Sequence, residues 1–121
     1  MAQILVIEDE TEILRMIISI VENAGHQTIS ASNGSEGLDA YRQHQIDLVI
    51  TDIMMPQKDG VETIRELRRN NPEAKIIAIT GFRGQYNRLP AAQYVGAQRT
   101  LIKPFSQIDL VAAIEELLET S

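Results

Sequence analysis

Charged and polar side chains follow four apolar, strand-length runs of this chain, at the point where each run ends. In chain order these residues are Glu8 and Asp9, then Asp52, Thr80 and Lys103. The carboxyl ends of parallel strands share one edge of a sheet, and that edge is where ligands bind in open α/β folds. Three carboxylates, a hydroxyl and an amine would therefore meet at a single shallow site.

Such a group of side chains favours one kind of chemistry. Two carboxylates about 4 Å apart repel each other by roughly 4 kcal/mol at an effective dielectric near 20, so three of them require a cation or protons. Oxygen ligands without His or Cys select a hard ion, and Mg²⁺ suits a site that keeps several waters. Carboxylates, Mg²⁺, one lysine and one hydroxyl are the components of phosphoryl transfer. Asp52 is the candidate nucleophile because it is central and flanked by both sources of positive charge.

The runs that position these residues alternate with helical patterns. The predicted strands cover residues 3–7, 27–31, 48–52, 75–80 and 98–102. The central run lacks polar alternation, which is typical of a strand buried on both faces, whereas the second is polar and alternating, as expected at a sheet edge. The alternation predicts an α/β fold with a doubly wound parallel sheet in three α/β/α layers. Its strand order would be flavodoxin-like, 2-1-3-4-5.

Local signals mark the ends of the predicted helices. Thr11 is the expected cap of the first helix, and Gly25 is the expected left-handed residue that ends it. Gly60 opens the third helix, and Ser106 with Asp109 forms a capping box for the last one. Between residues 81 and 96 we expect a loop and then a short helix from about residue 89 or 90 to residue 95.

Composition narrows the class of protein. The chain has 121 residues, 44% of them apolar, which predicts a single globular domain over residues 1–121. It has no Cys, which excludes disulfides and thiol chemistry, and neither a signal peptide nor an apolar run of membrane-spanning length is recognised. We therefore expect a cytoplasmic protein without membrane contact. The net charge of −6 would repel a phosphate backbone, so we expect no direct nucleic-acid binding.

The sequence resembles the receiver domain of bacterial two-component response regulators, of which the chemotaxis regulator is the minimal form. The resemblance covers essentially the whole chain, and it depends on several short motifs that are jointly specific. These motifs are Glu8-Asp9, Asp52, Pro56 with Gly60, Thr80, and Lys103-Pro104-Phe105.

The resemblance implies that Asp52 accepts a phosphoryl group from a phosphohistidine on a sensor kinase or a phosphotransfer protein. Lys103 would pair with the phosphoryl oxygens, and Thr80 would swing in to hydrogen-bond one of them. Magnesium would be held by the following groups: the side chains of Glu8, Asp9 and Asp52, and the backbone carbonyl of Met54.

The family implies a signalling domain rather than an enzyme. Such a domain catalyses only the phosphorylation and dephosphorylation of its own aspartate. Phosphorylation would switch an output surface that acts on a downstream domain or target protein. The family also implies that the bond between Lys103 and Pro104 is cis.

This chain departs from the family pattern at three places. Thr100 stands three residues before Lys103, where receiver domains commonly have an aromatic residue. The rotamer of that aromatic side chain follows the position of the threonine that corresponds to Thr80. Met54 and Phe82 flank the path of an attacking water, and we hypothesise that they slow hydrolysis of the acyl phosphate. The region from Gly81 to Gly96 contains glycine and proline where the family has a regular helix.

Other functions fit the sequence less well. A receiver-like module that docks partners without phosphorylation usually lacks one of the acids or the lysine, and all of them occur here. A phosphohydrolase with an aspartyl phosphate commonly has a second Asp two residues beyond the nucleophile, where this chain has Met54. A flavodoxin-type FMN binder needs a phosphate loop after the first strand, and none is found. Each site residue alone could be an ordinary turn, cap or surface residue, but together they would require four coincidences.

Overall fold

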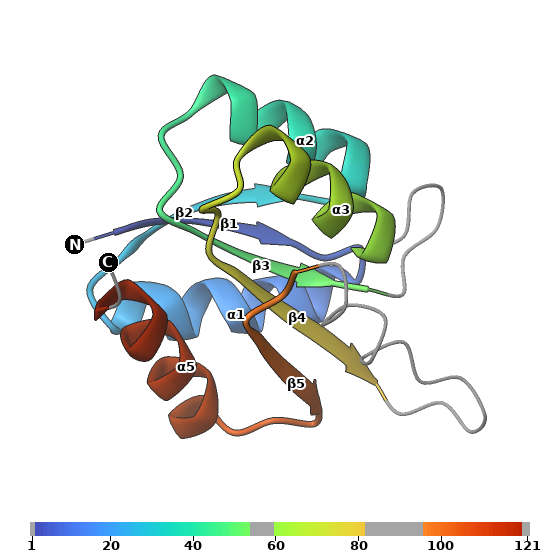
Figure 1. The fold of residues 1–121 in the computed structure, drawn as a ribbon. Helices are drawn as coiled ribbons and strands as arrows, with labels where there is room; N and C mark the ends of the chain where they lie inside the picture. Colours follow the sequence, from blue (N-terminus) through green and yellow to red (C-terminus); the bar gives the residue numbers. More distant parts are fainter. Residues whose placement is uncertain (1, 54–59, 82–95, 120–121) are drawn as a thin grey trace.

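The computed structural model of the chain describes residues 2–53, 60–81 and 96–119, and for Thr80 and Gly81 the backbone alone. Five parallel strands form one sheet in the order β2-β1-β3-β4-β5, as the sequence predicts. The strands are β1 (Gln3–Ile7), β2 (Gln27–Ala31), β3 (Leu48–Asp52), β4 (Ile76–Gly81) and β5 (Arg99–Lys103). Their arrowheads in Figure 1 point towards one common edge of the sheet.

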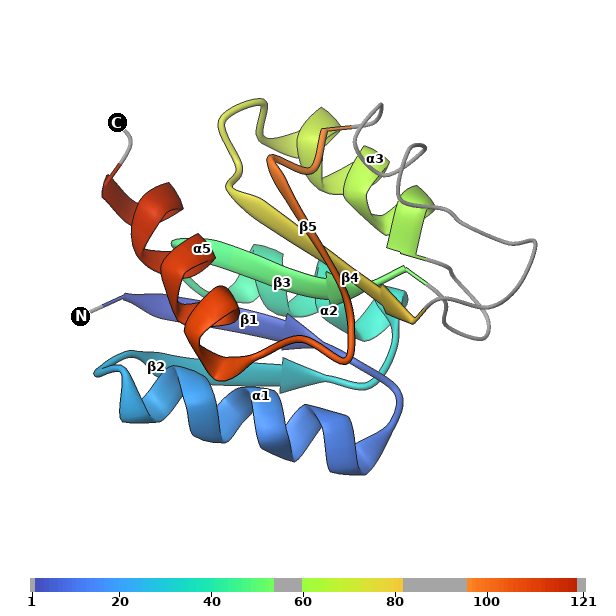
Figure 2. The ribbon, with the colours of Figure 1, turned by 90° about the horizontal axis from the view of Figure 1, so that it is seen from below.

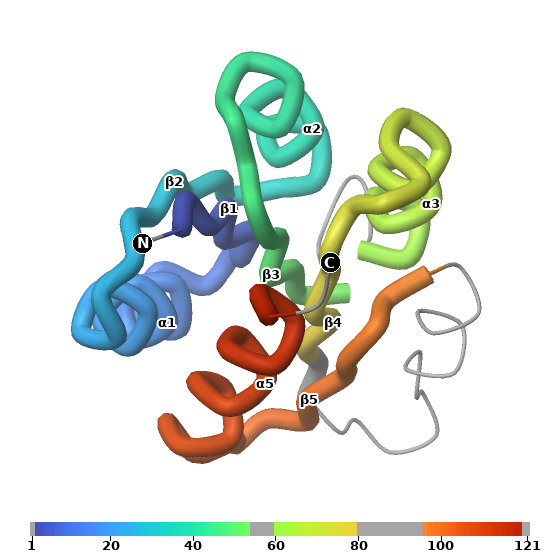
Figure 3. Tube along the Cα trace, turned by 60° about the vertical axis from the view of Figure 1, so that its left-hand side comes forward, coloured from blue at the N-terminus to red at the C-terminus, as the bar shows by residue number. Residues whose placement is uncertain are grey.

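Four helices of the described residues cover the two faces of the sheet. They are α1 (Thr11–Asn23), α2 (Gly34–Gln43), α3 (Gly60–Asn70) and α5 (Gln107–Glu119). Helices α2 and α3 lie on one face and α1 and α5 on the other, which gives the predicted three layers (Figures 1, 2 and 3). The short helix expected near residues 89–95 lies outside the described residues.

Side chains of the central strands alternate between the two layers, because successive residues of a strand point to opposite faces. Val6 of β1 and Ile50 of β3 pack in the apolar cluster beneath α1 and α5. Their neighbours Ile7 and Val49 pack in the cluster beneath α2 and α3. Every residue of β3 is buried, whereas β2 is partly exposed, so the predicted central and edge strands are confirmed.

The helix ends agree with the sequence signals except at α1. Gly25 has the left-handed φ of 95° expected of it, and the Asp109 amide donates to Ser106 Oγ at 3.0 Å. Thr11 is not the cap of α1, so that prediction was wrong. The N-cap residue is Glu10, so the helix begins at Thr11, one position earlier than the sequence predicts. The Glu10 side chain makes no capping hydrogen bond.

Strands β4 and β5 are each displaced by one residue from their predicted bounds. The cause lies in Gln98, whose side-chain amide donates to the Ala74 carbonyl at 3.0 Å and accepts from the Ile76 amide at 2.8 Å. Because this side chain occupies the backbone groups at the start of β4, the strand pairing begins beyond it, at Ile77 with Arg99. Strand β5 ends on Lys103, which pairs with Gly81, instead of on the residue before it.

Gly60 brings the start of α3 against the end of β3. Its amide donates to the Ile53 carbonyl at 3.1 Å. A Cβ at this position would overlap both the Asp52 carbonyl oxygen and the Ile53 Cα, which are backbone atoms that cannot rotate away. Glycine is therefore required here by close approach of two backbone segments.

Replacing Gly60 by alanine should lower the free energy of unfolding by about 1–3 kcal/mol, the usual cost of forcing extra volume into a packed site. Gly37→Ala is the matched control, since Gly37 also lies in a helix against the sheet. Its new Cβ would meet the end of the Ile7 side chain, which can adjust, and alanine gains up to about 1 kcal/mol of helix propensity. Urea unfolding of the two variants should show the larger loss for Gly60→Ala. Equal losses would contradict the close approach.

Candidate phosphoryl-transfer site

The strand register brings the ends of β1 and β3 to the same level. Ile7 pairs with Thr51, so Glu8, which directly follows β1, lies level with Asp52. Lys103 is the last residue of β5, paired with the last residue of β4. The three charged residues therefore occupy the carboxyl edge of the sheet, where the sequence predicts the site.

These three side chains also share one face of the sheet. Glu8, Asp52 and Lys103 each stand two positions beyond an apolar residue that packs on the α1 and α5 side. Those apolar residues are Val6, Ile50 and Leu101. Because the side-chain period of a strand is two, all three charged groups project to that same side.

Lys103 bridges two buried carboxylates. Its Nζ lies 3.0 Å from Glu8 Oε1 and 2.8 Å from Asp52 Oδ2. The Glu8 side chain is 1% exposed and the Asp52 side chain 3%, whereas Lys103 retains 16% exposure. The other Glu8 oxygen accepts a hydrogen bond from the Glu10 amide at 3.1 Å. The bond between Lys103 and Pro104 is cis, which confirms the expectation from the resemblance.

The charges at this site are not balanced by the lysine. Burial, and next the charge of Asp52, raise the pKa of Glu8 from 4.5 to about 7, against the opposing effects of the Glu10 amide and Lys103. Burial by itself lowers the pKa of Lys103, but its hydrogen bonds and attraction to Asp52 and Glu8 outweigh burial and raise it. The site consequently holds its lysine firmly charged and still has negative charge in excess.

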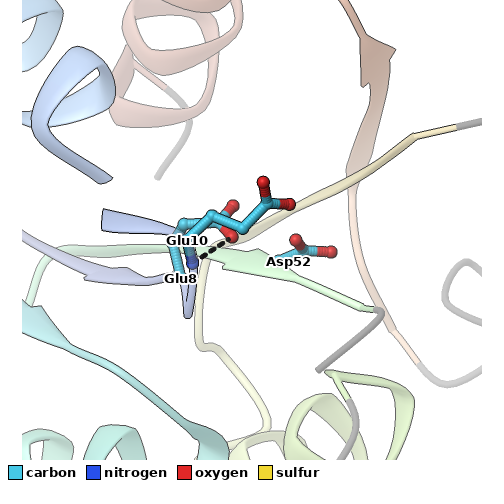
Figure 4. A group of neighbouring side chains, drawn as sticks. All are labelled: Glu8, Glu10 and Asp52. Atoms are coloured by element: carbon cyan, nitrogen blue, oxygen red, sulfur yellow. Dashed lines mark hydrogen bonds between the residues drawn. The ribbon is translucent and has the colours of Figure 1, made fainter. Parts of the chain in front are cut away.

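Carboxylate oxygens from Glu8, Glu10 and Asp52 lie within 4.8 Å of one another, and we call these three residues the acidic group (Figure 4). All of its donors are hard oxygen atoms, and two of the three side chains are buried. This donor set suits Mg²⁺, which prefers carboxylates and retained waters over nitrogen or sulfur ligands. The residues present therefore fit the ion that the sequence suggests.

The structure brings together some of the predicted site residues and leaves others aside. Glu8, Asp52 and Lys103 converge as expected. Asp9 is exposed and is not part of the acidic group that the described residues form, so its role as a metal ligand stays a prediction. Glu10 was not among the predicted site residues, although it belongs to the same acidic run after the first strand.

Several predictions fall outside the described residues. The backbone of Thr80 lies near the end of β4, but its side chain is not described. Met54, Phe82 and most of the stretch between Gly81 and Gly96 are likewise outside the described part of the chain. Thr100, the residue in place of the usual aromatic, lies half-buried in β5.

The fold and the site define an α/β domain with a buried, lysine-bridged acid pair at the carboxyl edge of a parallel sheet. The family model of the response regulator receiver domain matches residues 4–115. The chain belongs to that family. No helix within the described segments has the length and apolar character that crossing a membrane would require.

Several similar proteins match over almost the whole chain. The response regulator receiver protein CpdR of Brucella abortus is 33% identical over 118 residues, which are 98% of each protein. A receiver domain protein from Clostridium thermocellum has a crystal structure with a TM-score of 0.91 and 36% identity, covering 98% of this chain and 94% of that one.

A third relative, response regulator TrrA from Thermotoga maritima, was solved in complex with Mg(2+)-BeF. It has a TM-score of 0.87 and 31% identity, covering 97% of this chain and 99% of that one. The chain spans about half the length of other curated relatives, which are named as transcriptional regulators.

Membership of this family carries a general function. The chain is a receiver domain of the kind found in two-component response regulators, and a phosphoacceptor role follows from the family. Receiver domains bind Mg²⁺ at their acidic pocket and interact with kinases or other phosphodonors and with output domains. They are signalling proteins.

The raised pKa of Glu8 predicts that the magnesium-free protein loses stability as the pH rises. The folded state binds the Glu8 proton more tightly than the unfolded state. The stabilising effect is therefore complete below pH 4.5 and is lost as the pH rises through about 7. Between pH 5 and pH 8 the free energy of unfolding should fall by about 1–3 kcal/mol more in the wild type than in Glu8→Gln. Urea titrations in EDTA at both pH values measure this, and parallel profiles for the two proteins would refute it.

Proposed function

We propose that Asp52 is the phosphoacceptor of this receiver domain and that its donor is a phosphohistidine on a sensor kinase or phosphotransfer protein. The observation that carries the proposal is the 2.8 Å contact between Lys103 Nζ and Asp52 Oδ2, within a pair of almost fully buried carboxylates. A nucleophile that attacks phosphorus needs positive charge beside it and access to the ligand. The Asp52 carboxylate meets both requirements, because it lies next to Lys103 at a ligand-binding edge.

In the proposed transfer, a carboxylate oxygen of Asp52 attacks the phosphorus atom in line with the scissile bond. An oxygen–phosphorus bond forms as the phosphorus–nitrogen bond breaks, and the leaving imidazole nitrogen keeps the electron pair and takes up a proton. Lys103 would then pair with the phosphoryl oxygens. Glu8 supports this role because its own hydrogen bond, 3.0 Å to Nζ, holds the lysine at the site.

We propose that Mg²⁺ occupies the same edge of the sheet. Its protein ligands would be drawn from the following groups: the side chains of Glu8, Asp9 and Asp52, and the backbone carbonyl of Met54. When bound, the ion supplies positive charge that neutralises the phosphoryl oxygens. The magnesium and beryllofluoride named in the structure of the Thermotoga maritima relative support this assignment.

The proposed output is a conformational switch. Phosphorylation of Asp52 adds nearly two negative charges and three strong acceptor oxygens. We propose that the Thr80 hydroxyl donates to one of these oxygens, and that the resulting movement changes a surface read by an output domain or a target protein. The only chemistry required of the domain is phosphorylation and dephosphorylation of its own aspartate. We propose that this transfer takes place in the cytoplasm.

Incubation with Mg²⁺ and phosphoramidate, a small donor that has the phosphorus–nitrogen bond of phosphohistidine, should add one phosphoryl group to the wild type. Asp52→Asn should gain none, because an amide is not a nucleophile for phosphorus. Asp39→Asn is the matched control, since Asp39 is an exposed residue of α2 that pairs with Arg42, and it should react like the wild type. Intact-protein mass spectrometry measures all three. Labelling of Asp52→Asn, or an unlabelled wild type, would overturn the proposal.

A further inference from the structure

Glu10 lies in the acidic group but has no part in the transfer described above. Its carboxylate is within 4.8 Å of ligand atoms from Glu8 and Asp52, although the residue itself is exposed (Figure 4). It begins α1 as the N-cap residue without using its side chain as a cap. The side chain is therefore not required for the local structure of the helix end.

The other two members of the acidic group are already bonded to protein donors. Glu8 uses one oxygen for Lys103 at 3.0 Å and the other for the Glu10 amide at 3.1 Å. Asp52 Oδ2 is likewise bonded to Lys103. No hydrogen bond to the Glu10 carboxylate occurs within the described segments. Glu10 thus offers the most accessible oxygen atoms of the group.

The charge of the acidic group suits a divalent ion. The ionised acidic group carries three negative charges, and Lys103 supplies one positive charge, which leaves two in excess. Mg²⁺ keeps several of its waters in protein sites, and a carboxylate at the solvent side of the group is well placed to receive hydrogen bonds from them.

We propose that Glu10 is a further magnesium-positioning residue, whose carboxylate contacts the hydrated ion bound beside Glu8 and Asp52. This inference rests on the proposed function insofar as Mg²⁺ binds at the Asp52 edge. It adds a residue that the resemblance does not supply, since the resemblance assigns Asp9. Residues that hold a metal through its outer shell typically contribute 10- to 100-fold to its affinity.

Isothermal titration calorimetry of the unphosphorylated protein with MgCl₂ tests this role directly. Glu10→Gln keeps the shape of the side chain and should raise the dissociation constant for Mg²⁺ about tenfold or more. Glu12→Gln is the matched control, because Glu12 is an exposed acid in the first turn of the same helix, and it should change the constant by less than about twofold. Glu10→Asp retains the charge but shortens the side chain, so it should also weaken binding.

The outcomes separate this inference from the function on which it rests. If the wild type binds Mg²⁺ and Glu10→Gln behaves like Glu12→Gln, the role of Glu10 is refuted and the proposed function stands. If Glu10→Asp binds like the wild type, the effect is one of general charge, and contact with the hydrated ion is refuted. If the wild type binds no Mg²⁺, the metal part of the proposed function fails as well. Thermal unfolding in EDTA should give equal midpoints for the wild type and Glu10→Gln, and MgCl₂ should raise the wild-type midpoint more.

Discussion

The structure depends on the burial of two carboxylates beside a single lysine. Removing an ionised carboxylate from water costs several kcal/mol, and an ion pair compensates for it only with good geometry and further hydrogen bonds. Lys103 makes good contacts to both Glu8 and Asp52, but one positive charge cannot neutralise two negative ones. Burial, and next the charge of Asp52, raises the pKa of Glu8, and the remaining imbalance makes the edge of the sheet receptive to an additional cation.

The fold maintains this imbalance because its layers keep water away from the acids. Helices cover both faces of the parallel sheet, so polar groups can gather only where the strands end. The apolar residues before Glu8 and Asp52 are fully or almost fully buried, which holds the two strand ends rigidly in register. Gly60 adds a further restraint, since it lets the start of α3 lie against the backbone of Asp52. The packing thus fixes the position of the Asp52 carboxylate before any partner binds.

Much of this arrangement follows from the sequence because it is set by short-range rules. Apolar runs that alternate with helical patterns determine the parallel sheet, and the side-chain period of two determines that Glu8, Asp52 and Lys103 share a face. The turn after β1 follows no such rule. Three consecutive acids could each project into the site there, and the backbone conformation that selects Glu10 over Asp9 also makes Glu10 the helix cap. Propensity alone favoured Thr11 as that cap, whereas the structure has Glu10 there, with its amide bonded to the buried Glu8 carboxylate.

The electrostatic cost of burying Glu8 and Asp52 beside one lysine connects the stability of the domain with its function. A ligand can shift a conformational equilibrium only by the difference in its affinity for the two states. At this site the difference arises from charge, since a cation or a phosphoryl group changes the balance among side chains that are already held in place. A neutral residue in place of Glu8 would leave one carboxylate beside one lysine, and such a balanced pair would attract a cation less. The excess of negative charge beside Lys103 is therefore the property on which the proposed switch would depend.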